Sequence, residues 1–464
     1  IHFRGLAGRP LCLPQTAFQE LSDRCQLLSA FLRRAQAPSV AAVASRMHVA
    51  LIGVLTGRSG EIPTAKPESV GMSSEKLAKV TEVMKKFVAE KKVAGVTTIV
   101  VRKGKVVFFE SAGKREIEAD TPMKPDSIFR IYSMSKPIVS VAAMTLWEEG
   151  KFKLDDPLHK YIPEFKRAQV LDYSGNTHKL LDPIRPVLVR DLFRHTSGIT
   201  YSDDEEHTQP YYEKEGLFYH GPEEIYPPNM TTEEGVKRLA RIPLLHDPGK
   251  KFSYGFNTDI LGRLVEIWSG MPLDQYVDRS ICKPLGMVDT AFFVPQEKAD
   301  RFASLHARRN GKLTVIARGK DSPYINGFKW ISGGGGLVST ALDYGRFCLM
   351  VLNGGAYHGH QVLKSRTVSL MFTDQLSPAT GPVMFGERVS AQGFGLGFAL
   401  GDIVLGSGSL ERPSTTYTWG GYANTYFYII PDANLIQVFL RQEVPSNHEL
   451  SKIVFDIVNR GVKE

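Results

Sequence analysis

The sequence predicts an α+β fold in which an antiparallel sheet, flanked by helices, is joined to a mainly helical lobe. Strand-like runs lie at both ends of the 464-residue chain, at residues 96–101 and 105–112 and again at 425–430 and 435–441. Helical patterns fill the middle. Strands from both ends meeting in one sheet, with helices packed on it, form a layered α+β architecture. The length exceeds that of one average domain.

These patterns divide the chain into three parts. Residues 1–62 are rich in Arg and Ala and poor in acids, and we expect a peripheral extension there. Residues 63–164 and 311–464 are expected to form one α/β domain from both ends of the chain. Residues 165–310 are expected to form a mainly helical domain.

The individual elements have local signals. Residues 73–90 read as a helix with Ser73 or Ser74 as N-cap. Lys103-Gly104 between the first two strand-like runs predicts a hairpin, and so does the segment 431–434 between the last two. Further helices are expected at residues 137–149, 231–241, 259–268 and 447–460.

Composition excludes several classes of function. The net charge is +8, but the densest basic group lies on the amphipathic helix at residues 73–90 and indicates a solvated face, so no nucleic-acid partner is expected. No run is long enough for an integral membrane segment. The four cysteines are widely spaced, so neither a disulfide framework nor a zinc site is predicted. We expect no metal and no cofactor. The compartment stays open, with the cytoplasm favoured.

The candidate nucleophile is Ser133, in the run Ser133-Met134-Ser135-Lys136. A Ser-x-x-Lys spacing on a helix places both side chains on one face, where a desolvated lysine can take the serine proton. The motif alone is weak, because it also occurs at Ser73, Ser111 and Ser280. Ser133 differs in following an apolar strand-like run and opening an apolar helix, whereas the other three matches read as a helix cap or surface turns.

Several stretches in order strengthen this interpretation. They are Phe129–Pro137, Leu154-Asp155-Asp156-Pro157, Arg194–Ile199, Pro248-Gly249 with Phe252-Ser253-Tyr254, Gly333–Thr340 and Trp419-Gly420-Gly421. Together they resemble the serine β-lactamase-like superfamily, including class C enzymes and penicillin-binding proteins, over roughly residues 65–460. The resemblance is closest to the family VIII carboxylesterases. It implies a β-lactamase/transpeptidase-like fold.

The resemblance also implies roles for residues. Ser133 is the expected nucleophile, with Lys136 and Tyr254 as catalytic partners. Trp419, Gly420 and Gly421 are expected on an edge strand that lines the cleft, because glycines let a backbone approach substrate closely. The N–H groups of Ser133 and Tyr422 are expected to form the oxyanion hole, with Gly421 as the alternative register. The run Gly333–Gly336 is expected to be a tight turn near the cleft.

Two departures from the family pattern bear on the substrate. In β-lactamases and peptidoglycan peptidases the second motif is Tyr-x-Asn, but here Phe256 follows Tyr254 by two positions and Asn257 comes one later. The third motif begins with Trp419 where those enzymes usually have lysine. We expect Phe256, Asn257 and the Trp419 strand to contact substrate. A flat apolar group suits an uncharged substrate, so both departures favour neutral esters over β-lactams or D-Ala-D-Ala peptides. Short-chain carboxylic esters are the expected substrates.

The sequence therefore predicts a serine carboxylesterase whose partner is a small-molecule ester. The alternatives are a β-lactamase or D,D-peptidase, an acyltransferase, and an inactive penicillin-binding-like protein that acts by binding. The oligomeric state is not predicted.

Overall fold

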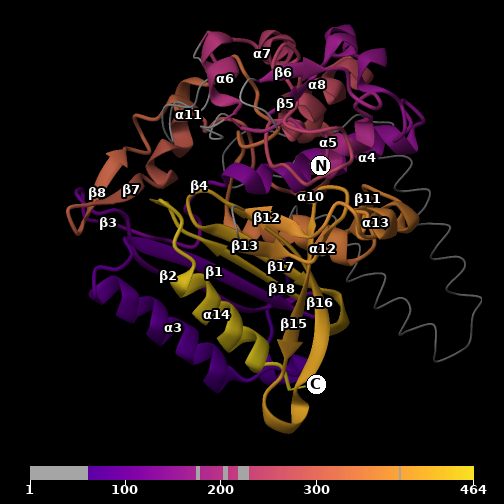
Figure 1. Ribbon diagram of the computed structural model, residues 1–464. Helices are drawn as coiled ribbons and strands as arrows, with labels where there is room; N and C mark the ends of the chain where they lie inside the picture. Colours follow the sequence, from indigo (N-terminus) through magenta and orange to yellow (C-terminus); the bar gives the residue numbers. More distant parts are fainter. Residues whose placement is uncertain (1–60, 174–177, 202–206, 218–228, 386–387, 464) are drawn as a thin grey trace, which may run out of the picture. The chain divides into compact units, whose positions relative to one another are not determined.

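The largest sheet of the structure is antiparallel, and the other elements are arranged around it (Figure 1). The computed structural model describes residues 61–173, 178–201, 207–217, 229–385 and 388–463. The extension expected over residues 1–62 lies outside this part except for its last two positions. Residues Ile62–Glu464 form one compact unit, and the predicted boundaries between an α/β and a helical domain stay a prediction.

The main sheet confirms that both ends of the chain supply strands. Among the described residues it has eight strands, in the order β14-β15-β16-β17-β18-β1-β2-β3, with antiparallel neighbours. The N-terminal strand β1 pairs with the C-terminal strand β18, with Ile99 opposite Val438. The strands are β1 (Gly95–Arg102), β2 (Lys105–Glu116), β3 (Thr121–Pro122), β14 (Gly393–Phe394), β15 (Ala399–Leu405), β16 (Arg412–Gly421), β17 (Thr425–Ile430) and β18 (Leu435–Leu440).

The two predicted hairpins are present. Lys103 and Gly104 join β1 to β2 with φ values of 49° and 73°, the left-handed pair that a two-residue hairpin turn requires. The 3-10 turn Pro431–Ala433 and Asn434 join β17 to β18. The turn residues therefore predicted both hairpins correctly, one near each end of the chain.

Shorter ladders surround the main sheet. One of them, β4 with β9, leads directly into the candidate nucleophile. The ladders are β4 (Phe129–Arg130) with β9 (Val338–Ser339), β5 (Val170–Asp172) with β6 (Lys179–Leu181), β7 (Leu305–Arg309) with β8 (Lys312–Ala317) and β19 (Glu443–Val444), β10 (Ala356–Tyr357) with β11 (His360–Gln361), and β12 (Val383–Phe385) with β13 (Arg388–Ala391).

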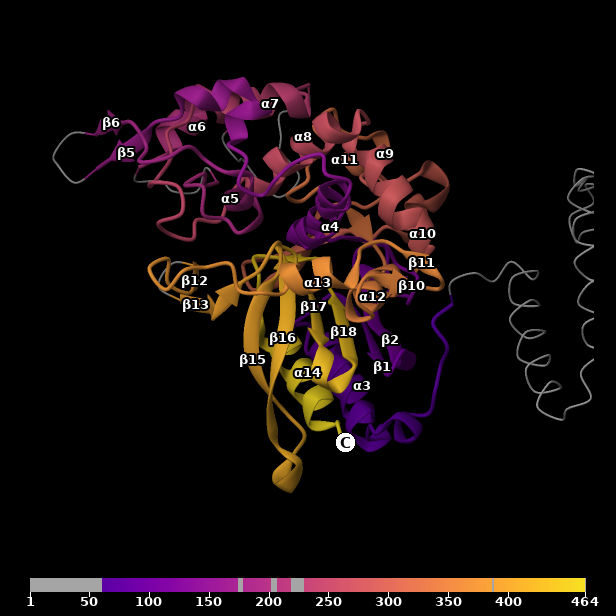
Figure 2. The same cartoon turned by 90° about the vertical axis from the view of Figure 1, so that its right-hand side faces the viewer.

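Helices cover both faces of the main sheet (Figures 1 and 2). Helices α3 and α14 pack together on one face, and α12 packs on β18 and β1 from the other. The helices are α3 (Ser74–Ala89), α4 (Ser135–Glu148), α5 (Val189–Phe193), α6 (Gln209–Lys214), α7 (Thr232–Leu239), α8 (Asn257–Ser269), α9 (Leu273–Val277), α10 (Lys283–Leu285), α11 (Pro323–Asn326), α12 (Ala341–Leu352), α13 (Ser365–Met371) and α14 (Glu449–Arg460). Ser73 caps α3, accepting from the Lys76 amide at 3.3 Å as predicted. None of the described helices has the length and apolar character needed to cross a bilayer.

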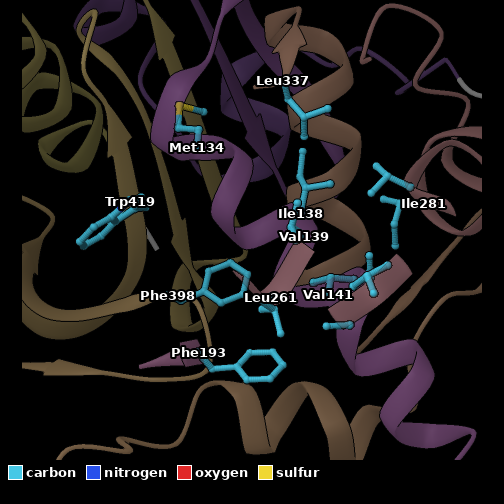
Figure 3. Close-up of a cluster of buried hydrophobic side chains, with 14 of the residues drawn as sticks. Met134, Ile138, Val139, Val141, Phe193, Leu261, Ile281, Leu337, Phe398 and Trp419 are labelled. Carbon is cyan, nitrogen blue, oxygen red and sulfur yellow. The ribbon is translucent and has the colours of Figure 1, made fainter. Parts of the chain in front are cut away.

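Helix α4 lies at the centre of the largest apolar cluster. Its buried residues include Ile138, Val139 and Val141, so it is covered on every side rather than along one stripe. Figure 3 shows these side chains with Leu261 of α8 and with Phe398 near the start of β15. The helix that follows the candidate nucleophile is therefore fixed by close packing.

Candidate active site

A sharp change of chain direction presents Ser133. Strand β4 pairs with β9, and the Ile131 amide continues that pairing by donating to the Leu337 carbonyl at 3.1 Å. The next residue, Tyr132, has φ of 43°, a region that residues other than glycine rarely adopt. Ser133 lies in the short turn Tyr132–Met134, directly before α4. Unusual backbone of this kind clusters at functional sites, and here it leaves Ser133 partly exposed.

Neighbouring hydrogen bonds hold this turn in place. The Met134 carbonyl accepts from the Tyr344 hydroxyl of α12 at 2.9 Å. The Ser135 hydroxyl accepts from the Leu337 amide at 3.0 Å. The nucleophile segment is thus anchored to α12 and to the chain that follows the glycine run, which limits the positions that the Ser133 hydroxyl can take.

Lys136 lies one helical turn after Ser133 and is 1% exposed. Its amine donates to the Ser133 hydroxyl at 3.2 Å, the Tyr201 hydroxyl at 2.9 Å and the Gly334 carbonyl at 2.7 Å. Burial lowers the pKa of Lys136 from 10.5 to about 7, while the negative charge of Asp259 opposes that shift. Near neutral pH a large fraction of the amine is therefore unprotonated and able to accept a proton.

Tyr254 precedes α8 and meets both catalytic partners. Its hydroxyl is hydrogen-bonded to the Ser133 side chain and accepts from the Trp419 indole N–H at 3.2 Å. The Lys136 amine lies 4.5 Å from the centre of the Tyr254 ring. Burial raises the pKa of Tyr254 above its ordinary value, so the phenol keeps its proton. This arrangement suits a proton relay, with Lys136 as the resting base.

The third motif lies at the end of β16. The edge-strand expectation was wrong for the strand as a whole, because β16 runs between β15 and β17. The pairing with β15 nevertheless ends at Thr418, opposite Ala399, whereas Trp419–Gly421 pair with β17 alone. As far as the structure describes the chain, Trp419–Gly421 therefore pair with a neighbouring strand on one side only, although β16 as a whole lies inside the sheet.

Close backbone contact explains the glycine at position 421. A Cβ on Gly421 would collide with the Ile131 carbonyl oxygen and with the Thr425 side chain, whose hydroxyl donates to that same carbonyl at 3.3 Å. The Tyr422 ring, 44% exposed, packs edge-on against Tyr132 with centroids 6.0 Å apart. The end of β16 thus lies against the nucleophile turn. An oxyanion hole formed by the Ser133 and Tyr422 amides stays a prediction.

Phe256 and Asn257 lie in the core behind Tyr254. Phe256 is 3% exposed and packs edge-on against Tyr201, with ring centroids 4.7 Å apart. Asn257 is fully buried, accepts from the Ser197 hydroxyl at 2.5 Å and donates to the Ile199 carbonyl at 3.1 Å. These contacts tie α8 to the loop after α5. Direct contact of either residue with substrate stays a prediction.

Three residues near Lys136 received no role from the sequence. Tyr201, two residues beyond the stretch Arg194–Ile199, contacts the amine directly. His195 is 1% exposed with its ring 4.8 Å from that of Tyr254, and its pKa falls well below 6.5 because of burial and the Lys136 charge. Asp259 is buried in the first turn of α8. The available signal was that His195 lies inside one of the quoted stretches, whereas Tyr201 and Asp259 lie a few positions after one.

The assembled groups can carry out acyl transfer. A partly exposed hydroxyl, a buried amine of near-neutral pKa and a protonated phenol meet within hydrogen-bond reach, which is the arrangement of an activated nucleophile with its base. Over the described ranges, no three His, Cys, Asp or Glu side chains cluster in a way that could hold a metal ion.

Comparisons with known proteins find hydrolases and acyltransferases among the relatives of this chain. The model of the Beta-lactamase family matches residues 80–453. Esterase EstB of Burkholderia gladioli is 32% identical over 226 residues, covering 49% of this chain and 53% of EstB. ML-236A carboxylate methylbutanoyltransferase mlcH of Penicillium citrinum is 28% identical over 84% of this chain and 94% of its own length. The solved structure of EstCE1, described as a hydrolase with promiscuous acyltransferase activity, superposes with a TM-score of 0.68 at 25% identity, covering 83% of this chain and 99% of EstCE1.

Proposed function

The chain belongs to the Beta-lactamase family, and from that premise we propose that it is a serine carboxylesterase that cleaves neutral esters through an acyl-enzyme on Ser133. One observation carries the proposal. The Lys136 amine, with its pKa lowered to about 7 by burial, lies 3.2 Å from the Ser133 hydroxyl. An alcohol beside an unprotonated amine becomes a nucleophile at neutral pH.

Acylation begins when the Ser133 oxygen attacks the ester carbonyl carbon. The Ser133 proton passes to the Lys136 amine, directly or through the Tyr254 hydroxyl, and the carbonyl oxygen takes the negative charge. The amides of Ser133 and Tyr422 would stabilise that charge. When the carbon–oxygen bond to the alcohol breaks, the same proton returns to the leaving alkoxide. An alcohol departs and the acyl group remains on Ser133.

Deacylation reverses these roles. Water attacks the acyl carbon and gives a proton to the same pair of groups. The Ser133 oxygen leaves and recovers its proton, and the acid is released. No other reactant is needed, because the atoms of ester and water account for both products.

The preference for a neutral substrate comes from Trp419. Its indole occupies the motif position where the related β-lactamases and peptidases usually have a lysine, and its N–H is directed at Tyr254 rather than at a substrate carboxylate. Phe256, two positions after Tyr254, lies in the core. Support for an uncharged substrate therefore comes from the aromatic, uncharged side chain of Trp419 alone.

The experiment compares wild type with Ser133→Ala on p-nitrophenyl butyrate. We expect the variant to lose hydrolysis entirely while keeping its thermal transition. In wild type, a fluorophosphonate probe should add to the peptide that contains Ser133. Hydrolysis by Ser133→Ala at the wild-type rate would contradict the proposal, and a faster rate on a chromogenic cephalosporin than on the ester would favour the β-lactamase alternative.

Acyl transfer to an alcohol is a second candidate, supported by the long match to mlcH and by the described activity of EstCE1. Both outcomes share the acyl-enzyme and differ only in what attacks it. Increasing concentrations of a small alcohol with p-nitrophenyl butyrate separate them. An esterase gives mainly butyric acid, whereas an acyltransferase gives mainly the new ester at alcohol concentrations far below that of water.

A further inference from the structure

The Lys136 amine is held by a backbone carbonyl as well as by two hydroxyls. Of the three hydrogen-bond partners that the described residues provide, the Gly334 carbonyl is the nearest, at 2.7 Å, and it can only accept a hydrogen bond. One N–H therefore points at Gly334 in either protonation state. An unprotonated amine has one more N–H and one lone pair, and these face the hydroxyls of Ser133 and Tyr201. The position of the Gly334 carbonyl thus limits the lone pair to the two directions of these hydroxyls.

The glycine turn Gly333–Gly336 rests on Asp259. The Ser332 hydroxyl accepts from the Gly335 amide at 3.0 Å and donates to Asp259 Oδ1 at 2.6 Å. A Cβ on Gly334 would collide with Asp259 Oδ2, so the carboxylate lies directly against the backbone that presents the carbonyl. The absence of a side chain at Gly334 is what allows this contact.

Helix α8 explains why a buried carboxylate is tolerated there. Asp259 is fully buried in the first turn of α8, and the positive end of the helix dipole favours an anion at that position. The same end of α8 follows Tyr254 by three residues. The start of α8 therefore positions the Tyr254 phenol, the Asp259 carboxylate and, through the glycine turn, the Lys136 amine.

We propose that Asp259 is the positioning residue of Lys136: through Ser332 it holds the glycine turn whose Gly334 carbonyl orients the amine, and its charge supports the buried cation. This inference rests on the proposed acyl-enzyme function. Asp259 acts through Lys136 and does not touch the reacting atoms.

The charges around Lys136 give the proposal a pH signature. Within the described part of the chain, the titratable groups that face the amine are Tyr201 and His195 from the loop after α5, and Tyr254 and Asp259 at the start of α8. The pKa of His195 is lowered and that of Tyr254 is raised, so both are neutral at pH 7. Asp259 raises the pKa of Lys136. Loss of its charge must therefore lower that pKa.

The experiment measures how fast a fluorophosphonate labels Ser133 between about pH 5 and pH 9. For Asp259→Asn we expect the midpoint of the acid limb to fall by roughly one pH unit. We also expect a plateau rate lower by about tenfold or more, because the lone pair is less well directed. Ser332→Ala, which keeps the charge but removes the link to the turn, should lower the plateau and leave the midpoint near its wild-type value.

A matched control is Asp343→Asn. Asp343 is a buried carboxylate in the first turn of α12, where it accepts from the Asp289 amide at 2.7 Å. Its loss should lower the melting temperature without moving the midpoint. Gly334→Ala, which pushes the carboxylate away from the turn, should reproduce the lowered plateau of Asp259→Asn.

The outcomes separate the two proposals. A folded Asp259→Asn with an unchanged plateau rate would overturn the positioning role, and an unchanged midpoint, or an equal midpoint shift in Asp343→Asn, would overturn the support by its charge. If wild type is labelled at Ser133 but turns over no ester, the esterase proposal is overturned, whereas the plateau and midpoint of Asp259→Asn still decide on Asp259. Absence of labelling in wild type would overturn both.

Discussion

The two sides of the candidate site differ in how far water reaches them. On the helix side, Lys136 and Asp259 are 1% and 0% exposed. On the strand side, Tyr422 is 44% exposed at the end of β16. Only a buried group has its pKa shifted strongly by desolvation, so the helix side sets the protonation chemistry. In the proposed function, the strand side contacts the arriving substrate and selects the acyl group.

The strongest test of this division removes the amine. Lys136→Ala should lower kcat by about 10³- to 10⁴-fold, because the serine loses its base. Steady-state hydrolysis of p-nitrophenyl butyrate measures the loss. Lys76→Ala is the matched control, since Lys76 belongs to another Ser-x-x-Lys run that caps α3, and it should keep wild-type activity. A comparable loss in both variants would show that the spacing alone does not define the base.

The next test addresses the strand side. Gly421→Ala places a Cβ against the Ile131 carbonyl, so the end of β16 must move away from the nucleophile turn. We expect kcat/KM to fall by about 10²- to 10³-fold, the range for losing one oxyanion donor. Gly401→Ala in β15 is the control, because its Cβ would find only ordinary contact with Thr416 at 3.6 Å. If Gly421→Ala keeps wild-type kinetics, the end of β16 takes no part in the mechanism.

A pH profile tests the helix side without a mutation. Lys136, with a pKa of about 7, loses its capacity as a base when it gains a proton. As the pH falls below 7, kcat/KM should drop about tenfold per unit with a single-proton slope. Above pH 7 it should reach a plateau. A rate independent of pH from about 5 to 8 would exclude the buried amine as the base.

The smallest expected effect concerns the contact between the two sides. Trp419→Phe keeps an aromatic ring at the end of β16 but removes the N–H that donates to Tyr254. Loss of one hydrogen bond of about 1 kcal/mol should lower kcat roughly fivefold. KM for p-nitrophenyl butyrate should stay within about twofold, because the apolar surface remains. A large rise in KM at unchanged kcat would assign Trp419 to substrate binding alone.

Local sequence signals predicted most of the helices and hairpins that surround the candidate site. The cap of α3, the Lys103-Gly104 turn and the closing helix α14 each depend on residues within a few positions of one another, and each is present in the structure. The edge-strand expectation for the third motif was wrong because strand order is a property of the whole sheet. The pairing of β16 with β15 stops at Thr418. The residues around Trp419 gave no sign of this end point.

The sequence by itself determined the spacing of Ser133 and Lys136, the α+β class and the departure from lysine at Trp419. Tertiary structure alone decided that Tyr201, Asp259 and the Gly334 carbonyl surround the amine, since these groups lie 65 or more positions from Lys136 along the chain. Burial by such distant segments is what lowers the pKa of the lysine. Desolvation depends on everything packed around a group, and no local pattern encodes it.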